Sequence, residues 1–278
     1  MKIGLLAGGG DLPRAVLDGA NRAGHEIFLG KLTDENFESD TSLGQKQFSL
    51  GEFGKISKVF KKVGVTHICL AGYVDRPDFS DLKPDFKTLT KLPGALLAAK
   101  KGDDALLRYV IEAFEQEGFK ILSPQELSAS LLMPAGHLGA HRIEDGDRAD
   151  AEKAMKTARE IGAMDIGQAA VVCRGVVLAV EAQEGTDAML QRVATLPENL
   201  RGNGSKRVGV LAKMVKPDQD KRVDLPTIGP RTVELAAEAG LAGIIVEAEG
   251  ALVLGREELI ERANEANIFV VGLPPLES

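Results

Sequence analysis

Short apolar runs alternate with helical spacing of apolar residues along the first half of the chain. Buried strands are predicted at residues 2–7, 27–29, 68–71 and 119–122. Helices are predicted from apolar residues that recur every three or four positions at 12–23, 56–63 and 107–114. Strands that alternate with helices predict a mostly parallel sheet covered on both faces, as in Rossmann-like domains.

The alternation stops between Ser128 and Gly146, where Pro134 and three glycines replace the apolar pattern. After it come a predicted helix from Asp147, a hairpin formed by 169–173 and 176–182, and further strands and helices. The pattern therefore predicts two α/β domains. They are an amino-terminal Rossmann-like parallel-sheet domain at 1–130, a linker at 131–146, and a carboxyl-terminal mixed-sheet domain at 147–278.

Charge and composition narrow the functional classes. The net charge is −7 and aromatic residues make up 4% of the chain, so we expect no nucleic-acid partner. Residues 201–222 differ from this negative net charge, because they include seven basic side chains and two acidic ones. Such a stretch fits an anionic ligand or a membrane surface, and a solvated charged face is the alternative.

The cysteines and the apolar runs bear on location. Cys69 and Cys173 each lie in a predicted strand, which is typical of buried free thiols in a reducing compartment. The sequence opens without the pattern of a signal peptide, and no apolar run reaches 18 residues. We therefore expect a cytoplasmic location.

A glycine-rich turn, Gly8-Gly9-Gly10, joins the first predicted strand to the first helix. Backbone amides and a helix N-terminus at such a turn can bind an anion or a nucleotide. Pro13 stands where a third glycine of the dinucleotide fingerprint belongs, and the second strand ends at Lys31 without an acidic residue for a ribose. NAD and FAD are therefore disfavoured, whereas another nucleotide or a purely structural tight turn stays open.

Polar residues also follow other strands and open other helices. Val74 and Asp75 come directly after the strand at 68–71, at the sheet edge where open α/β sheets bind ligands. Asp103 opens the helix at 107–114 and could either cap it or contact a ligand. Gln168 precedes the hairpin, and Glu181 interrupts the apolar run of its second strand. Helix capping does not explain these last two residues.

The richest segment runs from Lys213 to Pro230, between a strand and a helix. It combines lysines that can neutralise phosphate oxygens with carboxylates that can hold Mg²⁺. A metal can also make a bound water a nucleophile. Asp220 and Asp224 are the carboxylates best placed to serve a metal, and a solvated loop is the alternative.

Five of these segments together resemble the LpxI family of UDP-2,3-diacylglucosamine pyrophosphatases, in family order and across both halves. The matching segments are Leu5–Pro13, Gly102–Arg108, Asp165–Gln168, Glu181–Asp187, and Lys216–Asp220 continued by Asp224–Pro230.

The resemblance implies an Mg²⁺-dependent hydrolysis that yields UMP and 2,3-diacylglucosamine 1-phosphate (lipid X), without a covalent intermediate. It implies that the first domain holds UDP and the second carries most catalytic residues. It also implies a homodimer and peripheral contact with the cytoplasmic face of the inner membrane. The family leans toward attack on the β-phosphorus, which the residues themselves do not decide.

The resemblance also assigns site residues. The implied catalytic residues are Asp224, Lys213, Gln168 and Thr186. The implied metal ligands are Asp224, Asp220 and Glu181. The implied substrate-binding residues are Gly10, Asp11, Leu12, Val74, Asp75, Asp103, Ser123, Gln168, Glu181, Thr186, Lys213, Lys216, Gln219 and Thr227.

Two other functions compete with this interpretation. A non-catalytic carrier or sensor of an acylated sugar nucleotide would use the same cleft, and metal-dependent turnover would exclude it. A Rossmann-type oxidoreductase would need the dinucleotide fingerprint that this turn lacks, and NAD(P) binding would decide it.

Overall fold

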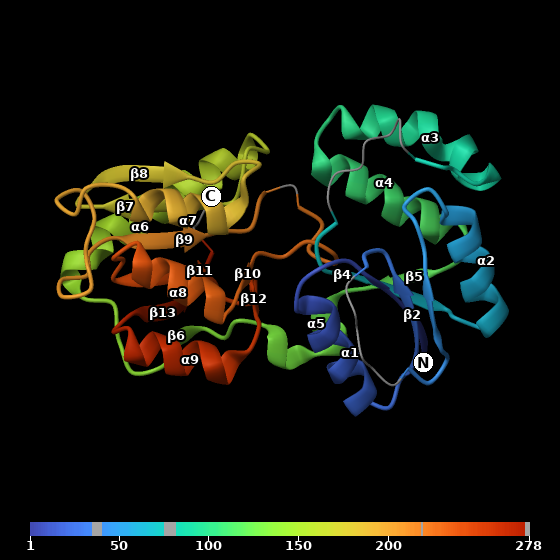
Figure 1. Ribbon diagram of the computed structural model, residues 1–278, viewed down its shortest axis with the longest axis horizontal. Helices are drawn as coiled ribbons and strands as arrows, with labels where there is room; N and C mark the ends of the chain where they lie inside the picture. Colours follow the sequence, from blue (N-terminus) through green and yellow to red (C-terminus); the bar gives the residue numbers. More distant parts are fainter. Residues whose placement is uncertain (35–40, 75–81, 218, 276–278) are drawn as a thin grey trace. The chain divides into compact units, whose positions relative to one another are not determined.

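The structure is a computed structural model that describes residues 1–34, 41–74, 82–217 and 219–275. The chain divides into two units (Figure 1). The first comprises Met1–Ser130 and Asp220–Asp224, and the second comprises Leu131–Gln219 and Leu225–Ser278. A short piece of the carboxyl-terminal half therefore belongs to the amino-terminal unit.

The first unit is built on a five-stranded, wholly parallel sheet in the order β3-β2-β1-β4-β5. Its strands are β1 Lys2–Ala7, β2 Glu26–Lys31, β3 Gln45–Gln47, β4 His67–Ala71 and β5 Lys120–Leu122. The predicted Rossmann-like sheet is confirmed. Strand β3 escaped prediction because its three residues are all polar and exposed.

Helices cover this sheet. They are α1 Leu12–Arg22, α2 Phe53–Val63, α3 Phe86–Ala99, α4 Asp103–Gln116 and α5 Pro124–Leu127. Phe60 of α2 packs edge-on against Phe28 with ring centroids 5.7 Å apart. Gly4 leaves the room for that ring, because a Cβ there would lie 2.4 Å from it. Apolar spacing had predicted α2 and α4 but not α3, whose large apolar side chains are exposed.

Glu117, just after α4, ties three helices together. Its carboxylate accepts hydrogen bonds from Lys61 at 2.7 Å, from Lys87 at 2.8 Å and from Ser57 at 3.1 Å. The hydrogen bonds from Lys61 and Lys87 lower the pKa of Glu117 from 4.5 to about 2. A carboxyl group whose pKa falls on folding stabilises the fold above its ordinary pKa, and loses that effect as pH falls toward the folded value.

Glu117→Gln is expected to lower the free energy of unfolding at neutral pH, because it removes the carboxylate that both lysines bind. The loss should be only about 1–2 kcal/mol, because both lysines are half exposed and solvent screens them. The deficit should narrow as pH falls from about 4.5 toward about 2. Denaturant unfolding at several pH values measures it. The control is Glu112→Gln, at an exposed residue of α4. Its free energy of unfolding should stay within about 0.5 kcal/mol of that of the parent. A deficit for Glu117→Gln that does not change with pH would contradict the assignment.

The second unit holds a six-stranded mixed sheet in the order β6-β13-β11-β9-β7-β8. Its strands are β6 Gly136–Leu138, β7 Ala169–Cys173, β8 Val176–Val180, β9 Val210–Lys213, β11 Gly243–Glu247 and β13 Phe269–Leu273. Strands β9, β11 and β13 are parallel, and β6, β7 and β8 each run antiparallel to their neighbours. A small parallel pair joins β10 Thr227–Ile228 to β12 Leu252–Val253. The predicted mixed sheet and its hairpin are confirmed.

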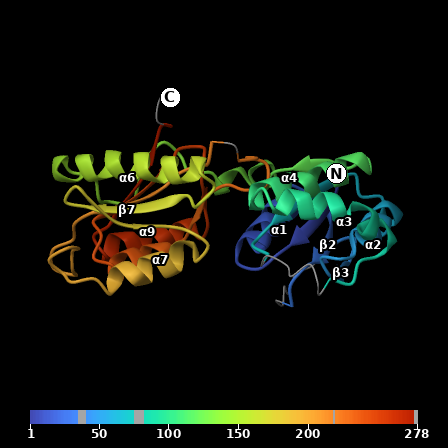
Figure 2. The same ribbon diagram turned by 90° about the horizontal axis from the view of Figure 1, so that it is seen from above.

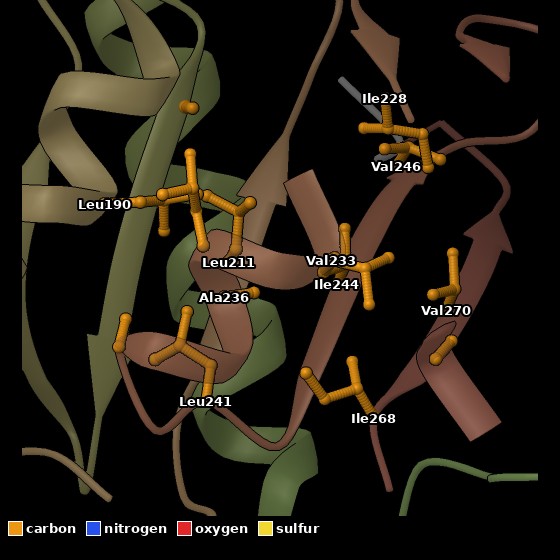
Figure 3. Close-up of a cluster of buried hydrophobic side chains, with 14 of the residues drawn as sticks. Leu190, Leu211, Ile228, Val233, Ala236, Leu241, Ile244, Val246, Ile268 and Val270 are labelled. Carbon is orange, nitrogen blue, oxygen red and sulfur yellow. The ribbon is translucent and has the colours of Figure 1, made fainter. Parts of the chain in front are cut away.

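Helices lie on both faces of this sheet. Helix α6 (Asp145–Ala163) covers one face, whereas α7 (Gly185–Ala194), α8 (Pro230–Glu238) and α9 (Arg256–Glu265) cover the other (Figure 2). On the second face Leu190, Leu211 and Ile244 belong to one fully buried cluster (Figure 3). Alternate residues of the same strands, such as Ala212 and Ile245, pack in a separate cluster with α6. Burial on both faces explains why these strands are continuously apolar.

Residues 131–146, which we predicted to be a linker, lie in the second unit. Strand β6 pairs with β13, and Leu138 and Met133 are buried in the core of that unit. The backbone N–H of Met133 donates to Ala251 O at 2.9 Å. The stretch therefore contains an edge strand, which includes Gly136, and reaches the start of α6, a role that composition alone does not separate from a linker. None of the described helices is long and apolar enough to cross a bilayer.

Candidate functional site

The glycine-rich turn of the first unit lies against the chain that leaves β4. Gly8 N–H donates to Ala71 O at 2.8 Å, and Gly9 N–H donates to Tyr73 O at 2.7 Å. A Cβ on Gly8 would lie 2.2 Å from Tyr73 O, so only glycine permits this approach of two backbones. The amides of Gly8 and Gly9 are therefore already used, and ligand binding at this turn depends on the residues that follow.

Gly10, Asp11 and Leu12 follow β1, where the strand order of the sheet reverses. Strand β1 has β2 on one side and β4 on the other, so its carboxyl end is the topological switch point at which open α/β sheets bind ligands. Asp11 precedes α1 and makes no side-chain capping bond. Val74 follows the same edge and is 39% exposed. Asp75 lies outside the described residues.

Ser123 and Asp103 have local roles in the same unit. Ser123 follows β5, is buried, and shares a hydrogen bond of 2.7 Å with the carboxylate of Glu126 as part of the cap of α5. Asp103 is the exposed first residue of α4, where a negative charge complements the helix dipole.

Three predicted residues of the second unit meet at one edge of its sheet. Gln168 precedes β7, Glu181 follows β8, and Lys213 ends β9. The register pairs Ala169 with Lys213 and Ala170 with Val180. Since β7 runs antiparallel to both neighbours, its amino end lies beside the carboxyl ends of β8 and β9. Gln168, Glu181 and Lys213 are thereby brought to one edge of the sheet.

Glu181 is the centre of this group and is 6% exposed. One carboxylate oxygen accepts a hydrogen bond from the Thr186 hydroxyl at 2.6 Å, and the other accepts the backbone N–H of Gln168 at 3.1 Å. The side-chain oxygen of Gln168 is buried and has no hydrogen-bond partner among the described residues. An unsatisfied buried acceptor costs stability, so it points to a donor that a ligand or water would supply.

The neighbouring lysines are held by oxygen acceptors. Lys213 is 9% exposed, and its ammonium group donates to Thr227 O at 3.0 Å. Lys216 reaches Asp165 at 2.8 Å, while its backbone N–H donates to the side chain of Gln219 at 3.1 Å. Lys213 at the end of β9 and Lys216 in the loop after it are therefore both anchored, and one cationic group is buried at the sheet edge that Glu181 occupies.

Thr186→Val is expected to lower the free energy of unfolding by about 1–3 kcal/mol, because it leaves one buried oxygen of Glu181 without its donor. Thr186→Ser keeps the hydroxyl, so its free energy of unfolding should stay much closer to that of the parent. Urea unfolding of both variants measures the difference. Equal losses for the two substitutions would show that the methyl group of Thr186 contributes as much as its hydroxyl, and a larger loss for Thr186→Ser would contradict the hydrogen-bond account.

The segment Asp220–Asp224 packs on the first unit. Arg222 bridges Glu115 of α4 and Asp220, each at 2.8 Å, and Gln125 donates to Lys221 O at 3.1 Å. The Arg222 guanidinium holds the pKa of Asp220 below its usual range. We did not predict that this loop belongs to the amino-terminal unit. Arg222 and Glu115 are 107 residues apart in the sequence, so no local pattern indicates that they pair.

The three predicted Mg²⁺ ligands come from different units, since Asp220 and Asp224 belong to the first unit and Glu181 belongs to the second. The described residues contain no group of three His, Cys, Asp or Glu side chains able to hold a metal. Both oxygens of Glu181 accept hydrogen bonds, as do both oxygens of Asp220 from Arg222. Asp224, half-buried, is the third member of the predicted trio. Mg²⁺ commonly keeps few protein ligands and completes its shell with phosphate oxygens and water, so the site predicted at these carboxylates stays a prediction.

The basic stretch at 201–222 does not form a single surface. Arg207 donates to Ala237 O at 2.9 Å and Arg201 donates to Leu196 O at 2.8 Å, so both serve backbone carbonyls around helix ends. Lys213 and Arg222 are engaged as described above. We had expected this stretch to meet an anionic ligand or a membrane surface, with a solvated charged face as the alternative, and several of its basic side chains instead make contacts within the protein.

Two α/β units, each with polar side chains at one edge of its sheet, define a two-domain α/β protein. Comparison of the sequence with known proteins identifies the family. Residues 2–131 match the LpxI N-terminal domain and residues 134–271 match the LpxI C-terminal domain, so the chain belongs to the LpxI family. The predicted resemblance is confirmed.

A curated relative and two solved structures are similar to the chain. The UDP-2,3-diacylglucosamine pyrophosphatase LpxI of Caulobacter vibrioides is 50% identical over 276 residues, which cover 99% of each chain. CobK precorrin-6A reductase is 10% identical with a TM-score of 0.34, covering 100% of this chain and 91% of its own. The UDP-glucose 4-epimerase of Thermus thermophilus is 15% identical with a TM-score of 0.33, covering 99% and 87%. Nothing about this chain follows from structural likenesses at that level.

Proposed function

We propose that this protein hydrolyses the diphosphate of UDP-2,3-diacylglucosamine in lipid A biosynthesis, giving UMP and 2,3-diacylglucosamine 1-phosphate. The observation that carries the proposal is the 50% identity to the Caulobacter vibrioides enzyme over nearly the whole of both chains. The buried polar cluster at the edge of the second sheet supports it, because phosphoryl transfer depends on positioned charges more than on covalent chemistry.

In this proposal the second unit handles the diphosphate. Lys213 neutralises charge that develops on phosphate oxygens, and its burial keeps water from weakening that interaction. Gln168 offers its unsatisfied side-chain oxygen to a substrate donor. Glu181 and Thr186 hold that region in place through their mutual hydrogen bond. Lys216, Gln219 and Thr227 would complete the substrate contacts.

The first unit would hold the nucleotide. Gly10, Asp11 and Leu12 at the switch point are the leading contacts, since ligands of open α/β sheets bind there. Val74, Asp75, Asp103 and Ser123 complete the proposed set. Ser123 would act mainly through the backbone around it, because its hydroxyl is engaged in the cap of α5.

Asp224 would hold the Mg²⁺ ion, which supplies Lewis acidity to the diphosphate and to the attacking water. Asp220 would then act as a positioning residue, since its bridge to Arg222 fastens the loop that carries Asp224. Glu181 would likewise position its neighbours. A homodimer and work at the cytoplasmic face of the inner membrane remain part of the proposal on the strength of the family.

The test is release of UMP from UDP-2,3-diacylglucosamine by the purified protein, with Mg²⁺ and with EDTA. Mg²⁺-dependent release of UMP and the sugar 1-phosphate in equal amounts is expected. Binding of the lipid nucleotide without turnover under both conditions would instead support a carrier or sensor, and would leave the buried cluster without a catalytic role.

A further inference from the structure

Glu247 is a buried carboxylate to which the proposed function gives no role. It ends β11 and is 8% exposed, and its side chain forms no hydrogen bond or ion pair within the described part of the chain. The other buried acidic residues there, Asp150 and Glu181, each accept two hydrogen bonds. A carboxylate accepts hydrogen bonds and donates none, and its burial without a donor costs folding free energy. The carboxylate of Glu247 is therefore suited to a donor that comes from outside the chain.

The turn after β11 holds this side chain in place. The backbone N–H of Ala248 donates to Leu273 O at 2.8 Å, and that of Gly250 donates to Glu247 O at 3.2 Å. A Cβ on Gly250 would lie 2.9 Å from one carboxylate oxygen of Glu247 and 3.0 Å from its Cδ. The glycine thus leaves the space that the carboxylate occupies, and the chain positions this group while giving it no partner.

Glu247 lies in one row of the second sheet with Met214 and Gln168. The register pairs Val246 with Lys213. The next residues, Glu247 and Met214, are therefore level with each other, and the N–H of Met214 donates to Gln168 O at 2.9 Å. Met214 packs with α6, as do the residues two positions from Glu247 and from Gln168 within their strands, so the side chains of the row share the face that α6 covers. The unsatisfied oxygen of Gln168 and the carboxylate of Glu247 thus flank Met214.

The chemistry of these two acceptors selects one part of the proposed substrate. A carboxylate repels the diphosphate, and acyl chains donate no hydrogen bonds. A metal ion would need more ligands, and no three acidic, His or Cys side chains of the described residues are grouped to hold one. The nucleotide is assigned to the first unit. The glucosamine ring is acylated at positions 2 and 3 and carries the diphosphate at position 1, so its free hydroxyl groups, at C4 and C6, are the neutral donors that remain without an acyl chain.

We infer that Glu247 determines substrate specificity by accepting a hydrogen bond from a free hydroxyl group, at C4 or C6, of the acylated glucosamine ring. A hydroxyl bound to a carboxylate makes a charge-assisted hydrogen bond. A site with such a buried acceptor discriminates strongly against a ligand without the hydroxyl, because the acceptor is then left unpaired. The inference deepens the proposed function and rests on it for the identity of the ligand.

The test is a cycle of binding measurements on the whole protein in detergent, by calorimetry with EDTA present to prevent turnover. The ligands are UDP-2,3-diacylglucosamine and its 4-deoxy and 6-deoxy analogues. The parent should bind one of the two analogues about tenfold more weakly, or worse, than the complete ligand. Glu247→Ala should bind the complete ligand about tenfold more weakly and lose little more with that analogue. Equal discrimination by the parent and the variant would overturn the inference.

Two further variants separate binding from folding. Glu249→Gln is the matched control, since Glu249 is exposed in the same turn, and it should discriminate like the parent. Glu247→Gln keeps the side-chain volume, and it should unfold at about the same urea concentration as the parent because it breaks no bond within the protein. A large loss of stability in Glu247→Gln would assign a structural role to this carboxylate and overturn the inference.

Release of UMP by the parent with Mg²⁺ tests the proposed function separately. Hydrolysis without any coupling between Glu247 and a hydroxyl group would refute the inference alone. Coupling without hydrolysis would refute the proposed function and leave the hydroxyl contact in place. Failure of the parent to bind any of the three ligands would refute both.

Discussion

Replacing Asp224 by alanine is expected to abolish turnover while the substrate still binds. The carboxylate lies in the loop 220–224, which the bridge between Asp220 and Arg222 fastens. Asp224 is the carboxylate that holds Mg²⁺ in our account. Loss of the group that stabilises developing charge costs about 10²–10³-fold in kcat or more. Steady-state kinetics with saturating Mg²⁺, together with calorimetric binding of the substrate, measures the two effects separately.

Asp220→Asn is the matched comparison, in the same loop. It weakens the bridge to Arg222 and so should loosen the loop, which predicts a smaller fall in kcat that high Mg²⁺ does not restore. If Asp224→Ala keeps most of its kcat, or if Asp220→Asn is the more damaging change and responds to metal concentration, the roles of the two carboxylates are reversed.

Lys213→Met is expected to lower kcat by about 10²-fold or more, with a smaller change in KM. Methionine keeps much of the side-chain volume in a site that is 9% exposed but removes the cation and the hydrogen bond to Thr227 O. A buried positive charge stabilises a transition state that gains negative charge more than it stabilises the ground state. Kinetics over a range of substrate concentrations separates the two parameters.

Lys206→Met is the control for Lys213→Met, since Lys206 belongs to the same basic stretch and is exposed. It should leave both kinetic parameters near those of the parent. A rise in KM with unchanged kcat for Lys213→Met would assign this lysine to substrate binding alone.

The fold was largely predictable where burial dictates the sequence. Strands β1 and β7 are almost continuously apolar because both sheet faces are covered, and that pattern identified them directly. The gathering of Gln168 and Glu181 was also predictable. Each interrupts or borders an apolar strand, and strands that end at one edge bring their flanking residues together.

The sequence was uninformative where two contacting residues are far apart along the chain, or where the apolar face of a helix is exposed to solvent. The loop 220–224 joins the first unit through Arg222 and Glu115, and no local pattern reveals such a pairing. Helix α3 was missed because most of its large apolar side chains, among them Phe86, Leu89 and Leu97, are exposed. The glycines of the β1–α1 turn indicated a ligand loop, but Gly8 is required by the backbone of Tyr73.

The most direct test of the central claim is the fate of water oxygen during the reaction. With UDP-2,3-diacylglucosamine in water enriched in ¹⁸O, the account predicts UMP and the sugar 1-phosphate in equal amounts, with one ¹⁸O atom in the phosphate of a single product. Label in the sugar 1-phosphate would mean attack on the β-phosphorus, and label in UMP would mean attack on the α-phosphorus. Formation of UDP instead of UMP, or no cleavage by a protein that binds the substrate in the presence of Mg²⁺, would contradict the claim that this protein hydrolyses the diphosphate.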